Sequence, residues 1–203
     1  MNLRAPGGKA GHRRLNIGPS GPRYTRAMTQ DRIEQLASTP AVLAHLVVEA
    51  SGDMLDRAPA PGEWPPRLVL AHLRDIEYLS WRPGLERALG EDRPELALFD
   101  TERWVAGRSR ARDRKEHLLA DFALQRQASL GILRALEASS WRRTLRAPRL
   151  GEFDVSALVD AWATHDAEHV AQLERALGET LAEAQARRTA WAASYPRPGG
   201  ATG

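Results

Sequence analysis

Residues 157–177 read ALVDAWATHDAEHVAQLERAL and carry the period of an amphipathic helix. The inward stripe of this helix takes positions three or four residues apart: Leu158, Trp162, His165, His169, Leu173 and Ala176. Asp154 or Ser156 is suited to cap the start of the helix, and Gly178 favours its end. The pattern predicts a helix over residues 157–177 that has two histidines among its apolar side chains.

Three other segments share this helical period, at residues 31–55, 67–89 and 114–138. Thr39-Pro40 is expected to kink or divide the first segment, and Pro83-Gly84 is expected to break or bend the second. Strand-like alternation is nearly missing from the chain. The sequence therefore predicts an all-α protein whose main body is a four-helix bundle.

Shorter elements are expected between and after these helices. A short helix is expected around residues 102–105, and the β-forming residues of 141–153 allow a hairpin-like excursion. Residues 179–193 are rich in alanine and predict one additional C-terminal helix.

The basic residues of this chain are unevenly spread over its 203 residues. Residues 1–27 hold six basic residues and no acidic one, so residues 28–203 carry a formal charge of −3. The first segment is also rich in Gly, Pro and Arg, which is typical of disorder. We expect a disordered basic tail over 1–27, a bundle domain over 28–195 and a disordered C-terminus over 196–203. The acidic domain argues against nucleic-acid binding.

Cysteine is absent, which excludes disulfides, thiolate zinc sites and a catalytic cysteine of the protein itself. Any thiol that takes part in its chemistry must come from outside. No uninterrupted apolar run approaches the roughly 20 residues of a membrane span. We therefore expect a cytoplasmic protein that has no membrane partner.

Three of the six histidines lie at positions that need a physical explanation. His165 and His169 are four residues apart on one helix face, with Cβ atoms about 6 Å apart, so both imidazoles can bind one metal ion. His72 lies on the inward stripe of a different helix, and facing helices commonly build metal sites in bundle cores. On spacing alone, neutral and hydrogen-bonded packing histidines stay an alternative.

The other three histidines are left out of the ligand set. His45 lies in the first helix and could be a core residue, a support for a ligand or a surface residue. His12 lies in the tail and His117 lies in a charged stretch, so both are expected to be solvated.

Four segments carry a resemblance to a known family: residues 63–66 (EWPP), 69–77 (VLAHLRDIE), 151–159 and 165–173 (HDAEHVAQL). They resemble the DinB-like family of DNA-damage-inducible metal-binding proteins. The specificity lies in one histidine on the second helix and a His-x-x-x-His-x-x-Gln motif on the fourth helix. The resemblance covers about residues 31–177.

This resemblance implies a four-helix bundle, often a homodimer, that holds a divalent metal ion, usually zinc or nickel. It implies that His72, His165 and His169 are the ligands. Asp75 lies one turn beyond the first ligand and Gln172 lies three residues beyond the last, so both are placed to orient a ring or a bound water. Alternatively, both are ordinary solvated residues at the end of the bundle.

The resemblance also implies chemistry, because similar enzymes transfer a low-molecular-weight thiol such as bacillithiol, mycothiol or glutathione to a small electrophile. In such a metal-dependent S-transferase, or in a hydrolase, the ion lowers the pKa of a bound thiol or water. Four tryptophans could wall the site or could be core residues: Trp64, Trp81, Trp104 and Trp162. The alternative functions are a non-catalytic, stress-associated metal-binding bundle and a metal-free helical scaffold.

Overall fold

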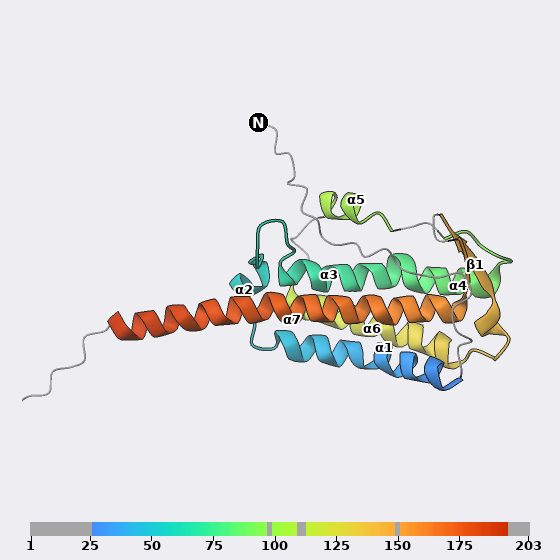
Figure 1. Ribbon diagram of the computed structural model, residues 1–203, viewed down its shortest axis with the longest axis horizontal. Coiled ribbons are helices and arrows are strands. Elements are labelled where there is room, and N and C mark those ends of the chain that lie inside the picture. The colour runs from blue at the N-terminus through green and yellow to red at the C-terminus, as the bar shows by residue number, and fades with distance from the viewer. Residues whose placement is uncertain (1–25, 97–98, 109–112, 149–150, 195–203) are drawn as a thin grey trace, which may run out of the picture.

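The computed structural model describes residues 26–96, 99–108, 113–148 and 151–194. Four helices run side by side along the long axis of the molecule (Figure 1): α1 (Arg26–Val47), α3 (Pro66–Ile76), α6 (Lys115–Arg134) and α7 (Val155–Ser194). Both α1 and α3 pack against α6 and α7. The predicted all-α class and four-helix bundle are therefore confirmed.

The first predicted helix is two helices in the structure. The apolar period predicts one helix over residues 31–55, whereas α1 ends at Val47 and a short α2 (Gly52–Asp56) follows. Ser51 caps α2, because its Oγ accepts a hydrogen bond of 3.3 Å from the backbone N–H of Met54. Pro40 lies inside α1, and the helix continues through it.

A π-helical turn interrupts the second long helical segment. η1 (Glu77–Trp81) follows α3 and leads into α4 (Arg82–Gly90), which has Pro83 in its first turn. The wider turn shifts the phase of the helix, so Glu77 and Trp81 are buried and Leu79 is 52% exposed. An α-helix of unbroken period would place Leu79 on the inward face together with His72 and Ile76, and the π turn moves it outward.

The long connection after α4 carries one short helix, as predicted. α5 (Thr101–Ala106) begins after Asp100, whose Oδ1 accepts a hydrogen bond of 2.9 Å from the backbone N–H of Arg103. Every residue of α5 is at least partly exposed. The helix lies next to α3 in Figure 1. Because none of its residues is fully buried, we expect contacts of single side chains to hold it there.

A small antiparallel hairpin closes one end of the bundle, where the sequence predicts a hairpin-like excursion. β1 (Thr144–Ala147) pairs with β2 (Gly151–Asp154), and the buried side chains of Leu145 and Phe153 lie opposite each other. Gly151 has a φ of +79°, which favours glycine. The chain then enters α7, and Oδ1 of Asp154 caps it by accepting a hydrogen bond of 2.9 Å from the N–H of Ala157.

The fourth predicted helix continues where the sequence predicts its end. α7 is a single helix of 40 residues that runs through Gly178, and its C-terminal part extends beyond the other helices (Figure 1). The additional helix expected over residues 179–193 is thus the continuation of α7. A glycine favours a helix end but does not impose one. Most of the expected basic tail, residues 1–25, lies outside the described residues, and α1 includes its last two residues.

The apolar core consists of two clusters that follow each other along the bundle. The hairpin-end cluster includes Leu36, Leu130 and Trp162, together with the buried side chains of the hairpin. The α2-end cluster includes Phe122 and Leu173, together with buried residues next to α2. Polar side chains lie between the two clusters, and they form the site described below.

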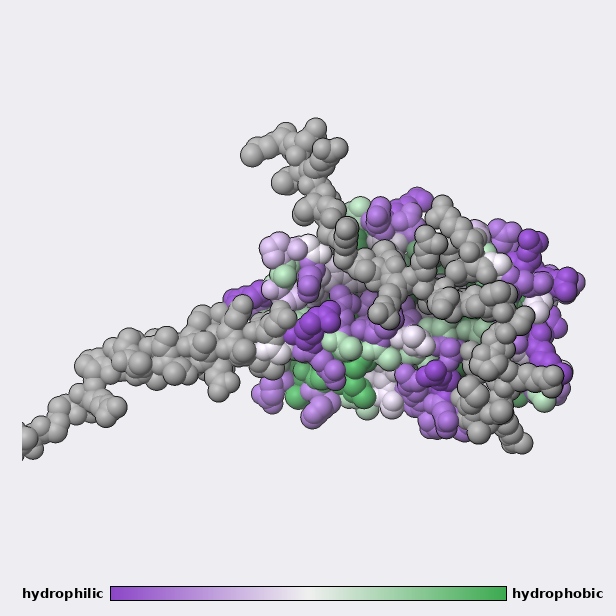
Figure 2. Space-filling model, in the orientation of Figure 1, coloured by the Kyte–Doolittle hydropathy of each residue, from purple (hydrophilic) through white to green (hydrophobic). Residues whose placement is uncertain are grey.

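The face seen in Figure 2 is mostly hydrophilic over the described residues. Apolar residues gather over the C-terminal half of α1, where Val42 is 36% exposed, and Val48 just beyond it is 61% exposed. Among the described residues, no helix combines the length and the apolar character that crossing a membrane requires.

Candidate metal centre

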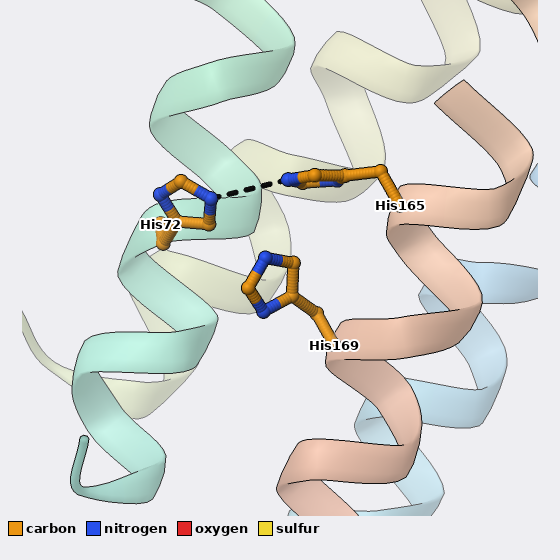
Figure 3. Close-up of side chains that lie close together, drawn as sticks. All are labelled: His72, His165 and His169. Carbon is orange, nitrogen blue, oxygen red and sulfur yellow. Dashed lines mark hydrogen bonds between the residues drawn. The ribbon is translucent and has the colours of Figure 1, made fainter. Parts of the chain in front are cut away.

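Three histidine side chains from two helices point toward one another between the helices (Figure 3). His72 comes from α3, and His165 and His169 come from successive turns of α7. Each residue offers a ring nitrogen that lies within 4.8 Å of the ring nitrogens of the other two. The Nε2 atoms of His72 and His165 are 3.2 Å apart. The structure thus brings together the three histidines that the sequence singled out.

This geometry fits one divalent ion. Imidazole nitrogens that share a tetrahedral zinc ion lie about 3.3 Å apart. The 3.2 Å between the two Nε2 atoms is close to that distance. A cation between the rings accepts a lone pair from each neutral imidazole. Among the described residues, these side chains form the only group of three or more His, Asp or Glu close enough to hold a metal ion.

Gln172 lies against one of the three rings. Its Oε1 is 2.8 Å from Nδ1 of His169, one helical turn earlier on α7. A hydrogen bond donated by Nδ1 to this oxygen places the lone pair of the ring on Nε2, where it is available to a metal ion. Gln172 thus lies in contact with the ring of His169.

Asp75 lies in a second polar group on the outer side of α3. Its carboxylate accepts hydrogen bonds from Nε1 of Trp104 (2.9 Å), from Nε of Arg74 (2.6 Å) and from Arg108. Burial opposes ionisation of Asp75, but these donors outweigh burial and hold the pKa of the carboxyl below its ordinary value. The ring of Trp104 lies 5.4 Å from the ring of His72, so Asp75 holds an indole that borders the site.

Aromatic side chains surround the three imidazoles. Four of them have ring centroids within 6.0 Å of the centroid of a histidine ring: Trp64, Trp81, Phe99 and Trp104. Trp64 contacts two of the imidazoles, edge-on to His72 at 5.2 Å and parallel to His169 at 6.3 Å. These rings limit the access of water and lower the local dielectric constant, which strengthens electrostatic interactions at the site.

A buried ionic cluster, formed by Glu77, Arg126 and Asp166, lies beside the histidines. Each of its side chains is at most 1% exposed. Arg126 makes two parallel hydrogen bonds to Glu77, from Nε at 3.0 Å and from Nη2 at 2.8 Å, and Nη1 donates to Oδ2 of Asp166 at 2.7 Å. Ser129 Oγ and Trp162 Nε1 also donate to Glu77, at 2.8 and 3.1 Å.

Mutual attraction favours the charged forms of Arg126 and Asp166 despite their burial. Burial opposes the charge of Arg126, but Asp166 and Glu77 outweigh it and raise the pKa of the guanidinium above its ordinary value. Burial likewise opposes ionisation of Asp166, and the charge of Arg126 outweighs it, so the pKa of this carboxyl lies below its ordinary value. Two carboxylates and one guanidinium give the cluster a formal charge of −1.

Arg126 also completes the hydrogen bonding of α1. Pro40 lacks the N–H that would bond the carbonyl oxygen of Leu36, four residues earlier in the helix. Nη1 of Arg126 donates to that oxygen at 2.8 Å. Because Pro40 cannot donate to it, the buried carbonyl oxygen of Leu36 accepts a hydrogen bond from Arg126 instead. The ionic cluster therefore connects α1, η1, α6 and α7.

The ionic cluster was not predicted from the sequence, although two of its residues lie at positions that indicate it. Arg126 lies four residues after Phe122 and four before Leu130, on the apolar stripe of α6. Asp166 lies four residues after Trp162 on the stripe of α7. A charged residue at a core position is rarely buried without a partner, so these positions indicate a buried ion pair.

The histidines outside the candidate site are solvated where they are described. His45 is exposed on α1, so it is a surface residue and neither a core residue nor a support for a ligand. His117 is exposed on α6, as predicted. His12 lies outside the described residues.

The chain is similar to known proteins over most of its length. Residues 35–173 match the family model described as the DinB superfamily. A protein of Oceanobacillus iheyensis, named "Putative metal-dependent hydrolase", is 22% identical over an alignment of 160 positions that covers 73% of this chain and 86% of that protein. A Bacillus cereus protein of the same name is 25% identical over an alignment of 159 positions that covers 74% of this chain and 88% of that protein.

A solved structure has the same fold. It is that of YfiT from Bacillus subtilis, described as a probable metal-dependent hydrolase with an unusual four-helix bundle topology. The TM-score is 0.71 and the sequence identity is 21%, and the match covers 80% of this chain and 95% of that chain.

Proposed function

Since this chain belongs to the DinB superfamily, we propose that it is an enzyme in which His72, His165 and His169 hold one divalent metal ion. The observation that carries the proposal is the convergence of three imidazoles, with ring nitrogens within 4.8 Å of one another. Three protein ligands leave a coordination position open, as catalytic zinc sites do and structural ones do not. We propose zinc or nickel, because imidazole suits both ions.

The proposed reaction is hydrolysis of a small molecule. A divalent ion held by neutral imidazoles lowers the pKa of a bound water or thiol and so supplies a strong nucleophile at neutral pH. The names of the two bacterial relatives favour water as that nucleophile. Gln172 keeps the ring of His169 in its ligating tautomer, and the indole of Trp64 keeps bulk water away from two of the imidazoles.

A second candidate reaction is the transfer of a low-molecular-weight thiol, of the bacillithiol type, to a small electrophile. The resemblance of the histidine motif to that of thiol-transferring enzymes supports it, and since the sequence has no cysteine, the thiol would be a cosubstrate. In this reaction the thiolate forms a carbon–sulfur bond, the leaving group departs with its electron pair, and the thiol proton passes to solvent.

The two reactions and a non-catalytic metal-binding role differ in their products. Protein loaded with zinc or nickel is assayed with p-nitrophenyl acetate alone and with 1-chloro-2,4-dinitrobenzene plus bacillithiol, mycothiol or glutathione. Ester cleavage that the loaded protein accelerates without thiol supports the hydrolase, and thioether formation from the thiol that the loaded protein accelerates over the protein-free reaction supports the transferase. A loaded protein that forms neither product supports the non-catalytic, stress-associated bundle.

Matched variants connect any turnover to the site. His169→Ala removes a proposed ligand, and His45→Ala removes an exposed histidine from the same bundle. We expect activity to be lost in the first variant and kept in the second. Equal activity in both variants would contradict the proposed site.

We further propose that the protein works as a homodimer in the cytoplasm on small molecules. Its chain mass is 22.4 kDa, so light scattering on the purified protein separates a dimer from a monomer. A single species at the monomer mass contradicts this part of the proposal and leaves the metal site unaffected.

A further inference from the structure

One carboxylate oxygen next to the candidate metal centre is buried without a hydrogen-bond partner among the described residues. It is Oδ1 of Asp166, whose other oxygen, Oδ2, accepts a hydrogen bond of 2.7 Å from Arg126. Oδ1 lies 3.7 Å from Nδ1 of His165, the preceding residue. That nitrogen is likewise buried and has no hydrogen-bond partner among the described residues.

Two such atoms so close together need a common explanation, because an unpaired buried polar group costs about 1–3 kcal/mol. Nε2 of His165 faces Nε2 of His72 at 3.2 Å, on the side where a metal ion would bind. A neutral imidazole that offers its lone pair at Nε2 carries its proton at Nδ1. Nδ1 of His165 is then a donor that faces an acceptor, and a shift of a few tenths of an ångström brings the pair within hydrogen-bond distance.

We infer that Asp166 is a positioning residue that holds the ring of His165 in the tautomer and orientation in which Nε2 binds the metal ion. The inference rests on the metal site of the proposed function and assigns a role to a residue outside the ligand set. Metal-binding histidines generally donate their second N–H to a carboxylate, a carbonyl or a water. Gln172 is placed to serve His169 in this way, and Asp166 serves His165.

The rest of the ionic cluster keeps the carboxylate of Asp166 in place. Arg126 binds Oδ2, and both oxygens of Glu77 fix the guanidinium in turn. The carboxylate can therefore rotate little, and Oδ1 stays directed to the histidine. The formal charge of −1 on the cluster also favours a cation on the far side of the ring.

The substitution Asp166→Asn separates this role from simple packing. Arg126 needs an acceptor, so the amide oxygen of the asparagine turns to the guanidinium and its NH₂ group turns to His165. A donor at that position favours a proton on Nε2 of His165, which blocks the lone pair for metal. We expect the zinc affinity to fall by about 10- to 100-fold, as for other partners of metal-binding histidines.

Glu168→Gln is the matched control. Glu168 also directly adjoins a proposed ligand, His169, and loses the same charge, but its side chain is exposed. The zinc dissociation constants of the wild type and both variants are measured by competition with a chromophoric chelator, and circular dichroism reports the helical content. We expect the control to stay within twofold of the wild type. An Asp166→Asn protein that folds and binds zinc within twofold of the wild type overturns the inference.

A measurement on the wild-type protein tests the role of Asp166 even if Asp166→Asn does not fold. Long-range ¹H–¹⁵N spectra of the zinc-loaded protein report which ring nitrogen of His165 carries a proton. We expect a slowly exchanging proton on Nδ1 and zinc on Nε2. Zinc on Nδ1 overturns the inference and leaves the metal site intact, whereas a wild type that binds no zinc, nickel or other divalent ion overturns the proposed function as well.

Discussion

Nδ1 of His169 and Oε1 of Gln172 lie 2.8 Å apart on successive turns of α7. The spacing of the motif His-x-x-x-His-x-x-Gln places these two side chains about one helical turn apart. In Gln172→Ala the ring loses the acceptor that selects its tautomer, so we expect zinc affinity to fall about tenfold or more. Gln127→Ala, at an exposed position of α6, is the control and should bind zinc as the wild type does.

Removal of one imidazole should remove the ion. We expect elemental analysis after dialysis to find about one divalent ion per chain in the wild type and in His45→Ala, and none in His169→Ala. The helical circular-dichroism signal should persist in all three. A chelator should also lower the melting temperature of the wild type, because an ion that binds only the folded state stabilises it. No ion in the wild type would mean that the histidines are packing residues.

The ionic cluster should make Arg126 one of the most sensitive positions of the bundle. In Arg126→Met, two buried carboxylates lose their partner and the Leu36 carbonyl loses its donor, which should cost about 3–5 kcal/mol of unfolding free energy. Arg134→Met, at an exposed position of the same helix, should change it by less than about 0.5 kcal/mol. Urea unfolding of both variants tests this, and equal midpoints would contradict the buried cluster.

Trp104 should hold α5 in place. The indole is the donor to Asp75 at 2.9 Å, and the guanidinium of Arg108 lies 4.7 Å from its ring. Trp104→Phe keeps a ring and loses a hydrogen bond to a charged group, worth about 1.5–3 kcal/mol. We expect amide hydrogens of α5 to exchange about tenfold faster or more, while those of α6 stay unchanged. Unchanged exchange in α5 would mean that other contacts hold it.

The contribution of Asp75 to stability should depend on pH. Its pKa in the folded protein lies below the ordinary value of 3.8, so its ionised form stabilises the fold above that value, and this stabilisation is lost as the pH falls through the folded-state pKa. Asp75→Asn should therefore be less stable than the wild type at pH 7, and the difference should shrink in strong acid. Urea unfolding at several pH values measures it, with the exposed Asp121→Asn as control. A difference that is constant down to pH 2 contradicts the assignment.

The helices of the bundle and the candidate ligands could be predicted because they depend on the spacing of residues that are near one another in the sequence. His165 and His169 share a face by spacing, and the position of His72 on an apolar stripe needs only the helical period. The hairpin and α5 also follow from nearby breaks and caps. The end of α1 at Val47 and the continuation of α7 through Gly178 could not be predicted in this way, because caps and glycines bias a helix end without fixing it.

The partners of the ligands could not be predicted, because they depend on the tertiary structure. Glu77 is buried at the start of the π turn, and its partners Arg126 and Trp162 come from α6 and α7, far away in the sequence. The link between Pro40 and Arg126 joins residues 86 positions apart through a carbonyl on a third residue, Leu36. The sequence indicates only that a proline and an arginine lie at unusual positions.

The two apolar clusters of the core lie on either side of the histidines and the ionic cluster, and this arrangement fixes the axial alignment of the helices. Apolar stripes alone tolerate sliding, because a leucine that moves by one turn meets another leucine. If α6 slid by one turn, about 5.4 Å, Arg126 would leave both of its carboxylates and enter an apolar layer. The polar layer therefore disfavours slipped packings of the bundle, and it sets the level on α3 at which His72 meets the two histidines of α7.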